Sequence, residues 1–287
     1  MDIQALSAFR AVAETGSFTR AAARLFITQP ATSKRVAALE AELGVKLFDR
    51  IGQRPELTHA GRLLLPRAIR ILDEVAESRR QIVNLSGKIC GRLVFATSHH
   101  IGLHRLPPVL QHFTRRYPEV QLDLRFMASE RACREVEAGH LELAVVTLPE
   151  STGANLHAEK LWDDKLEFVV SHDSQASNLN MLAQRDAILP SRETVTRQLI
   201  ARRFRESGFE LTVAMETNYL ETIKKMVEIG LGWSALPATM VDDSLRVVPI
   251  ENPIHRQLGI VTCPRRTLSN AGAAMNALLR VMARRHR

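Results

Sequence analysis

A polar run from Gln29 to Arg35 carries side chains whose hydrogen-bonding groups match the edges of base pairs. The Gln29 amide can form two hydrogen bonds with adenine, and the Arg35 guanidinium can form two with guanine, whereas the Ser33 hydroxyl accepts several partners. Lys34 adds a positive charge that suits a phosphate group. The run can therefore contact double-stranded DNA, with Gln29 and Arg35 as the first choices for reading bases.

Two short helices with a tight break between them would carry this run. Ser17 can cap the first helix, and Thr28 can cap the second, with Pro30 in the first turn, where its missing N–H costs nothing. The expected buried faces are Phe18, Ala21, Ala22 and Leu25 in the first helix, and Val36, Leu39 and Leu43 in the second. Thr32 then joins the outward polar face. This pattern is typical of a helix-turn-helix, in which the second helix enters the major groove. The alternative is an ordinary helical hairpin with a solvated polar face.

The segment after Gly44 indicates a two-stranded hairpin. Short extended pieces at 45–50 and 56–58 flank a turn that contains glycine and proline. Arg50 and Arg54 at its tip could lie against a phosphate backbone or enter a minor groove, as the wing of a winged helix does. Together with Arg20 and Lys34, they would make DNA binding strongly salt-dependent. A surface hairpin with incidental charge is the alternative.

Residues 59–86 read as one long helix with an apolar stripe that keeps close to a heptad spacing. The stripe consists of Leu65, Ala68, Ile69, Leu72, Val75, Ala76, Ile82 and Val83. A single exposed helix cannot bury such a stripe alone. We therefore expect the same helix of a second subunit to cover at least part of it. Packing against the chain's own second domain is the competing interpretation.

Strands alternate with helices beyond a short glycine-containing linker at 86–91. The expected strands are 92–97, 120–126 and 143–147 in a first half, and 166–171, 188–189, 211–215 and 232–236 in a second half. This alternation predicts βαβ units and a mostly parallel sheet. A late strand at 258–263 should return to the first half. We therefore predict two α/β lobes, joined by crossing segments near 148–161 and 264–269.

Polar side chains follow several of these strands, where an open α/β sheet binds its ligands. The expected cleft residues are Thr97, Ser98 and His99 after the first strand, Ala128 and Ser129 after the second, Thr147 in the third, and Ser191 and Thr194 before a helix of the second lobe. Hydroxyl groups, free amides and one or two cations suit a small carboxylate or another polar anion. For each serine or threonine, a plain helix cap is the alternative role.

Three histidines, His99, His100 and His104, could supply nitrogen ligands to a metal ion. No cysteine or carboxylate set lies nearby in the sequence to complete such a site, so we expect a partly solvated cleft histidine and no metal. Cys133 and Cys263 are expected to fill core space, because no resolving partner of the kind a peroxide sensor needs is visible.

Length and charge limit the possible classes of protein. A chain of 287 residues exceeds what one hydrophobic core usually fills, which predicts two or three domains. Its net charge of +8 favours polyanionic partners but does not separate nucleic acid from an anionic membrane surface. No apolar run approaches the ~20 residues that span a bilayer, and the first residues lack the pattern of an export signal, so we expect a cytoplasmic protein without membrane contact. No nucleophile-elbow, dinucleotide, P-loop or zinc-protease motif occurs, and we expect no enzymatic activity.

These features together resemble the LysR-type transcriptional regulators over essentially the whole chain. The resemblance rests on Gly16-Ser17-Phe18, Thr28-Gln29-Pro30-Ala31, Leu47-Phe48-Asp49-Arg50 and Leu57-Thr58-His59-Ala60-Gly61, and more loosely on Tyr117-Pro118-Glu119-Val120 and Gly230-Leu231-Gly232-Trp233. It implies an α plus α/β fold: an N-terminal winged helix-turn-helix with a long linker helix, and a C-terminal two-lobed α/β effector domain that resembles periplasmic binding proteins. The expected domains are 1–58 for DNA binding, 59–87 for the linker and dimerisation helix, and 88–287 for effector binding, with lobe I at about 91–160 and 265–287 and lobe II at about 161–264.

The resemblance also implies partners. It predicts a homo-oligomer, a dimer and possibly a tetramer, that binds operator DNA and a small-molecule inducer between the lobes without a cofactor, and that contacts RNA polymerase if it activates. The expected DNA-binding residues are Arg20, Thr28, Gln29, Pro30, Thr32, Ser33, Lys34, Arg35, Arg50 and Arg54. In a dimer, two recognition helices should meet successive major grooves ~34 Å apart. A DNA-binding protein that needs no inducer and, as a weaker alternative, an α/β enzyme remain open.

Overall fold

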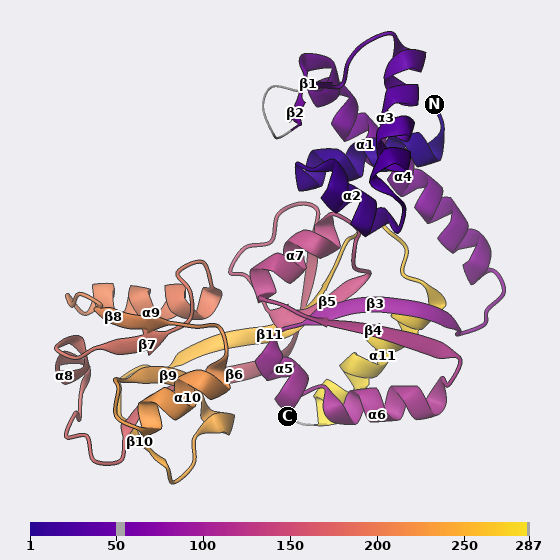
Figure 1. The fold of residues 1–287 in the computed structure, drawn as a ribbon. Coiled ribbons are helices and arrows are strands. Elements are labelled where there is room, and N and C mark those ends of the chain that lie inside the picture. Colours follow the sequence, from indigo (N-terminus) through magenta and orange to yellow (C-terminus); the bar gives the residue numbers. More distant parts are fainter. Residues whose placement is uncertain (50–54, 286–287) are drawn as a thin grey trace. The chain divides into compact units, whose positions relative to one another are not determined.

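The computed structural model describes residues 1–49 and 55–285 of the chain. These residues form two compact units, Met1–Val83 and Asn84–Arg287, which are described separately (Figure 1). No helix within the described residues combines the length and the apolarity that crossing a membrane requires.

The first unit begins with three helices, α1 (Ile3–Thr15), α2 (Phe18–Leu25) and α3 (Gln29–Leu43). The caps are those predicted from the sequence: the Ser17 side chain accepts a hydrogen bond from the backbone N–H of Arg20, and Thr28 caps α3 in the same way. Gly44 ends α3 in the left-handed conformation that favours glycine. The helices enclose a small apolar core around Phe9 and Leu39. The predicted helix-turn-helix is therefore present.

A two-stranded antiparallel hairpin follows, with β1 (Phe48–Asp49) paired to β2 (Glu56–Leu57). The Glu40 carboxylate of α3 holds its base, because it accepts hydrogen bonds from the backbone N–H groups of Leu47 (2.9 Å) and Phe48 (3.3 Å) and from the Lys46 ammonium (2.8 Å). Burial alone would raise the pKa of Glu40, but these hydrogen bonds outweigh it and lower the pKa. The recognition helix and the hairpin are thus fixed to each other.

Helix α4 (His59–Asn84) has the predicted length, and the Thr58 hydroxyl accepts a hydrogen bond from Gly61 at its start. The first half of its apolar stripe is covered by the same chain and needs no second subunit. Ala68 is buried in the core of the first unit, and Leu65 and Leu72 pack against that core. Only the later part of the stripe is exposed, where Ile82 is 68 % exposed and Val83 also faces outward.

The second unit is built on one mixed sheet that runs through both lobes, in the order β10–β6–β11–β5–β3–β4, with β9 also paired to β6. Its strands are β3 (Gly91–Thr97), β4 (Val120–Phe126), β5 (Leu143–Thr147), β6 (His157–Ser171), β9 (Ser234–Pro237), β10 (Leu245–Val248) and β11 (Ile254–Thr262). A separate parallel pair, β7 (Ala187–Leu189) and β8 (Val213–Glu216), lies in lobe II. The prediction of a mostly parallel sheet is confirmed for this pair and for β3 with β4 and β5. It is wrong for the rest of the large sheet, where β6, β9, β10 and β11 pair antiparallel.

Two long strands, β6 and β11, connect the lobes (Figure 1). The last residues of β11, Leu258–Thr262, already pair with β5 of lobe I, while its first residues pair with β6 at Leu166. The second crossing therefore lies within β11, and its prediction at 264–269 is wrong. Antiparallel pairing with β6 keeps the chain extended across the lobe boundary.

Helices cover both faces of the sheet in lobe I. Alternate residues of β3 point to opposite faces, so Phe95 packs on one side and Ala96 on the other. The helices of this lobe are α5 (His99–His104), α6 (Pro107–Arg116), α7 (Ser129–Glu137) and α11 (Asn270–Arg285). α6 and α11 contribute to the core around Phe95, and α7 contributes to the core around Ala96. Cys133 and Cys263 are buried in the latter core, as predicted.

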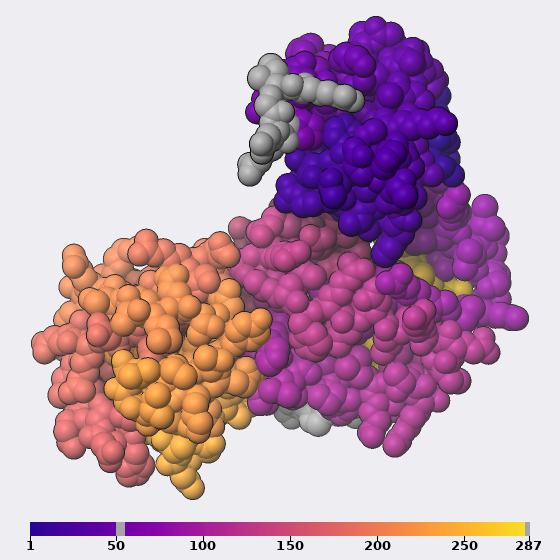
Figure 2. All heavy atoms as spheres, in the orientation of Figure 1, coloured from indigo at the N-terminus to yellow at the C-terminus, as the bar shows by residue number. Residues whose placement is uncertain are grey.

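Lobe II has its own core around three aromatic rings, of which Phe204 and Trp233 stack with centroids 5.1 Å apart, while Phe168 is tilted against both. Its helices are α8 (Leu179–Ala183), α9 (Val195–Glu206), α10 (Leu220–Glu228) and a short 3-10 turn, η1 (Ala238–Met240). The two lobes touch along part of their facing surfaces in the space-filling view, where lobe I is magenta and lobe II is salmon to orange (Figure 2).

Candidate functional site

The N-terminal end of α3 presents the polar face predicted to contact DNA. Thr28, Gln29, Pro30 and Lys34 are exposed, and Ser33 and Arg35 are half-buried. Without DNA, the Gln29 amide donates a hydrogen bond to the Ser33 hydroxyl at 3.0 Å, which holds both side chains on one side of the helix. This face can offer an amide, a hydroxyl and two cations to a groove of DNA.

Thr32 does not belong to this face. Its side chain is 0 % exposed, and its hydroxyl donates to the Thr28 carbonyl at 3.2 Å, so the prediction that it faces DNA is wrong. Thr32, Val36 and Leu39 stand at i, i+4 and i+7, which is the spacing of the inner stripe of a helix. Leu43, expected in that stripe, is exposed instead, because it occupies the last turn of α3.

Two further predicted phosphate contacts lie outside the described residues, namely Arg50 and Arg54. Arg20 is exposed on α2, and its guanidinium donates to the carbonyl of Thr15. The sequence did not single out Phe26, whose ring is 95 % exposed and whose φ is 56°, in the turn directly before α3. An aromatic residue in a helix-turn-helix turn is the signal that could have identified it as a candidate contact.

The second site is a small cleft of about 60 Å³ between the two lobes. It is lined by Ser98, His99, His100, Ala128, Ser129, Glu130, Thr147, Pro190, Thr194, Val195, Thr196, Asn218, Leu220 and Arg256. Six predicted residues meet here: Ser98, His99, Ala128, Ser129, Thr147 and Thr194. Residues that are remote in sequence thus come together at the starts of α5, α7 and α9.

Two predicted cleft residues do not line it. Thr97 is buried, and its hydroxyl donates to the Val145 carbonyl at 2.8 Å, so it fixes neighbouring strands instead. Ser191 lies outside the lining, and its backbone N–H donates to the Asn218 side chain at 3.0 Å. The prediction for Thr97 is wrong, because position in sequence near a strand end does not fix the direction of a side chain. The role of Ser191 in effector binding stays a prediction.

The hydroxyl groups in the cleft differ in how far existing hydrogen bonds leave them available to a ligand. Thr194 is committed as the cap of α9, since its hydroxyl accepts from the backbone N–H of Arg197 at 3.2 Å and donates to the carbonyl of Ser191 at 2.9 Å. Ser129 accepts from the backbone N–H of Thr147 at 3.1 Å. Ser98 precedes α5 without forming a cap hydrogen bond. Of these three, Ser98 is the hydroxyl most available to a ligand.

Arg256 places a buried positive charge in the wall of the cleft, and the sequence did not predict this residue as part of the site. Its guanidinium is 5 % exposed and pairs with the buried Asp164 carboxylate at 2.7 Å, and it also donates to Thr196 at 2.8 Å. Arg256 and Asp164 are cross-strand neighbours on β11 and β6, although 92 positions separate them in the chain. Among the described residues, Arg256 Nη2 has no hydrogen-bond partner.

A carboxylate already occupies the N-terminus of α9. Glu130, from α7 of the opposite lobe, accepts a hydrogen bond from the backbone N–H of Val195 at 3.0 Å through Oε1. Its Oε2 atom is buried without a partner among the described residues. The start of a helix binds anions through its free N–H groups, so this arrangement identifies a position that holds a carboxylate.

A histidine cluster borders the same cleft. His100 is buried, and this burial, with the charge of Arg256 as a lesser cause, lowers its pKa to about 3. Its imidazole is therefore neutral near pH 7. His99 and His104 face Glu221 of lobe II, each with a ring nitrogen 3.3 Å from one of its carboxylate oxygens.

Comparisons with known proteins agree with this architecture. The family model described as the LysR substrate binding domain matches residues 86–286, and that described as the bacterial regulatory helix-turn-helix protein, lysR family, matches residues 3–62. A probable RuBisCO transcriptional regulator from a Synechocystis species is 30 % identical over 286 residues, which cover 94 % of this chain and 83 % of that protein. An uncharacterised HTH-type transcriptional regulator from Azotobacter vinelandii is 63 % identical over 108 residues, 38 % of this chain and 75 % of that protein.

Solved structures share the fold over the full chain. Full-length CbnR, crystallised with its target DNA, has a TM-score of 0.62 at 22 % identity and covers 100 % of both chains. A full-length OxyR variant from Pseudomonas aeruginosa has a TM-score of 0.69 at 24 % identity, over 99 % of this chain and 95 % of that one. A helix-turn-helix with a polar recognition face, a two-lobed domain with a cleft, and family models that match residues 3–62 and 86–286 lead to one conclusion. The chain belongs to the LysR family and is a DNA-binding transcriptional regulator with a substrate-binding domain.

Proposed function

We propose that a small metabolite carrying a carboxylate binds in the cleft between the lobes and changes how the protein binds its operator. The observation that carries this proposal is the buried Arg256 guanidinium, which lines the cleft and keeps one nitrogen without a hydrogen-bond partner among the described residues. Because Nε bonds to Asp164 and Nη1 to Thr196, Nη2 is the nitrogen left to donate a charge-assisted hydrogen bond to a ligand carboxylate. The hydroxyls of Ser98 and Thr147 and the amide of Asn218 add polar partners around it.

Glu130 sharpens the expected chemistry of the ligand. Its carboxylate sits at the N-terminus of α9, so an incoming carboxylate would compete with it for the N–H of Val195. A displaced Glu130 would then face the ligand with a negative charge, which favours a ligand that also carries an ammonium group. Simple organic acids and amino acids are therefore the two classes to compare, and the small volume of the cleft favours compact members of both.

A thermal-shift screen of the full chain against organic acids and amino acids, in buffer with a chelator, tests this proposal. A ligand at 100 times its dissociation constant should stabilise the folded protein by about 2.7 kcal/mol, which raises the unfolding temperature by a few degrees. Ser98→Ala should weaken the response, because it removes an uncommitted hydroxyl from the cleft. Ser177→Ala, an exposed serine outside the cleft, is the matched control and should respond as the unaltered chain does.

A flat response to every member of both classes would contradict the proposal. It would favour the alternative of a DNA-binding protein that works without an inducer. An equal response from Ser98→Ala and the unaltered chain would place the ligand elsewhere in the molecule.

We further propose that the protein acts as a homodimer through the exposed part of α4, with tetramer formation and contact with RNA polymerase as later steps, and that it regulates in the cytoplasm without catalysing a reaction. The apolar side chains of Ile82 and Val83, exposed on the described chain, support the dimer. Ile82→Asp should shift the mass measured by light scattering toward the monomer. Gln81→Asp, an exposed position on another side of the same helix, should leave the mass unchanged. An Ile82→Asp protein that stays dimeric would exclude this part of α4 as an essential contact.

A further inference from the structure

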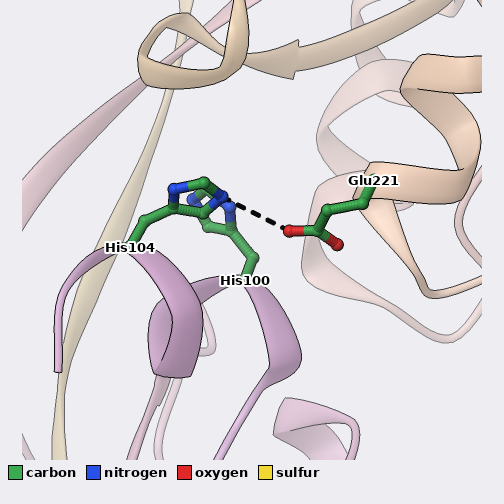
Figure 3. Close-up of side chains that lie close together, drawn as sticks. All are labelled: His100, His104 and Glu221. Atoms are coloured by element: carbon green, nitrogen blue, oxygen red, sulfur yellow. Dashed lines mark ion pairs between the residues drawn. The ribbon is translucent and has the colours of Figure 1, made fainter. Parts of the chain in front are cut away.

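A cluster of metal-binding side chains spans the two lobes beside the cleft. His100 and His104 stand four positions apart on α5, so both rings lie on one side of the helix. Glu221 approaches them from the first turn of α10 in lobe II. Figure 3 shows the two imidazole rings together, with the Glu221 carboxylate pointing toward them from the facing lobe.

The hydrogen bonding of this cluster is incomplete. The His100 side chain is 4 % exposed, and neither of its ring nitrogens has a hydrogen-bond partner among the described residues. The Oε1 atom of Glu221 is also buried without a hydrogen bond there, and its ion-pair contact with His104 Nε2 is 3.3 Å long. Buried polar atoms are rarely left in this condition, and an ion or an ordered water usually satisfies them.

The distances suit a bound metal ion. Ligand atoms of His100, His104 and Glu221 all lie within 4.8 Å of one another. Zinc binds imidazole nitrogen at about 2.0–2.1 Å in tetrahedral geometry, which puts neighbouring ligand atoms roughly 3.4 Å apart. The 3.3 Å separation of His104 Nε2 and Glu221 Oε1 already matches this spacing. Small side-chain rotations would bring the third ligand into range.

We propose that His100, His104 and Glu221 bind a divalent transition-metal ion of the zinc class between the two lobes. Two imidazoles and one carboxylate are a ligand set that zinc accepts, with the remaining position open to water. His99 would act as a positioning residue, because its Nδ1 lies 3.3 Å from the second carboxylate oxygen of Glu221. This site goes beyond the proposed carboxylate effector, since it requires no organic ligand and takes its metal ligands from both lobes.

Nearby positive charge limits the affinity of this site. Arg256 and Arg105 lie close enough to His100 to disfavour its protonated form, and they would also oppose a bound cation. Asp164 partly offsets them, since it pairs with Arg256 at 2.7 Å and with Arg105 at 3.8 Å. We therefore expect weaker binding than at closed structural zinc sites, and reversible exchange with chelators.

Titration of the full, untagged chain tests the site. Zn²⁺ is added to chelator-treated protein in a calorimeter, and Co²⁺ is added in parallel to record its visible absorption. The expected result is one ion per chain, with a Co²⁺ spectrum that reports nitrogen and oxygen ligands. His104→Ala and Glu221→Gln should each weaken binding by about 10–100-fold or more, because loss of even an outer partner of a metal ligand has such an effect.

The controls separate this site from adventitious binding and from the effector proposal. His104 and Glu221 are partly exposed, so their variants should fold, and His112→Ala removes an exposed histidine of a different helix, α6. His112→Ala should keep the affinity of the unaltered chain. Absence of one-to-one binding, or binding that survives in both His104→Ala and Glu221→Gln, would overturn the proposal. The carboxylate screen contains a chelator, so either proposal can fail without the other.

Discussion

The recognition face of α3 is formed by one continuous segment, whereas the cleft between the lobes is formed by segments that are distant in the sequence. The side chains of the recognition face are exposed, and its caps are local. The cleft draws on segments from Ser98 to Arg256, and its strongest charge is buried and already paired. Substitutions of the exposed residues on the recognition face should therefore change DNA binding without changing folding. Substitutions of the buried charged residues in the cleft wall should change both ligand binding and folding.

The buried ion pair offers the strongest test of this contrast. Asp164→Ala leaves the Arg256 guanidinium without its carboxylate in a buried position, and breaking such a pair costs about 3–5 kcal/mol. Urea unfolding of the full chain should show this loss in the free energy of unfolding. Asp123→Ala, which removes a pair to the exposed arginines Arg92 and Arg125, should cost less than about 1 kcal/mol. Equal losses in the two variants would mean that the cleft wall tolerates an unpaired charge.

The opposite behaviour is expected from Gln29→Ala on the recognition face. Loss of a two-bond contact to a base should reduce discrimination between operator and random DNA by about 1–3 kcal/mol, while non-specific binding persists. The free energy of unfolding should not change, because Gln29 is exposed and its amide bonds to Ser33 on the same surface of the helix. Gel shifts with both DNAs measure the ratio. An unchanged ratio would remove Gln29 from base readout.

Glu40 should show an intermediate effect, because it is buried like the cleft residues but belongs to the DNA-binding unit. Glu40→Gln should destabilise this unit by about 1–3 kcal/mol at pH 7, since hydrogen bonds to a charged group are lost or weakened. The exposed Glu42 on the same helix provides the control, Glu42→Gln, for which little change is expected. Unfolding curves measured side by side compare the two. A larger loss in Glu42→Gln would show that Glu40 does not hold the wing.

Lowering the pH should destabilise the DNA-binding unit through protonation of Glu40, by less than the substitution does. The folded-state pKa of Glu40 is lowered from its usual value of 4.5, so its contribution to stability is complete above that value and is lost as the pH falls below it, through the folded-state pKa. Stability of the unaltered DNA-binding unit should therefore fall more steeply below pH 4.5 than stability of Glu40→Gln. Parallel pH profiles for the two proteins would exclude this linkage.

The smallest effect is expected from oxidation. Burial raises the pKa of the Cys133 thiol to about 11, so the reactive thiolate is scarce at neutral pH. Operator binding should be the same before and after brief treatment with hydrogen peroxide. A loss of binding that Cys133→Ser prevents would show that this buried thiol is a sensor after all.

The same contrast explains which parts of the molecule could be read from the sequence. Ser17, Thr28 and Gly44 were assigned correctly because helix caps depend on a few neighbouring residues. Thr32 was misassigned although its spacing with Val36 already indicated an inner position. Six of the eight residues predicted to line the cleft do line it, because most of them follow strand ends that meet at the same edge of the sheet.

The remaining cleft residues could not be predicted because they depend on pairing between distant segments. Arg256 meets Asp164 only through the register of β11 on β6. Glu221 reaches His104 only because lobe II folds against lobe I. The carboxylate that the histidines lacked in the sequence thus comes from another lobe, and no local pattern in the chain predicts that approach.

Operator affinity with and without the carboxylate found by the thermal screen tests the central claim most directly, namely that the cleft controls the recognition face. The unaltered chain should change its operator affinity by a factor of about 5–150 when the ligand is saturating, the usual range for coupling between sites. Ser98→Ala should lose this change at the same ligand concentration and keep its affinity without ligand. A ligand that binds the cleft but leaves operator affinity and the DNase footprint unchanged would contradict the claim.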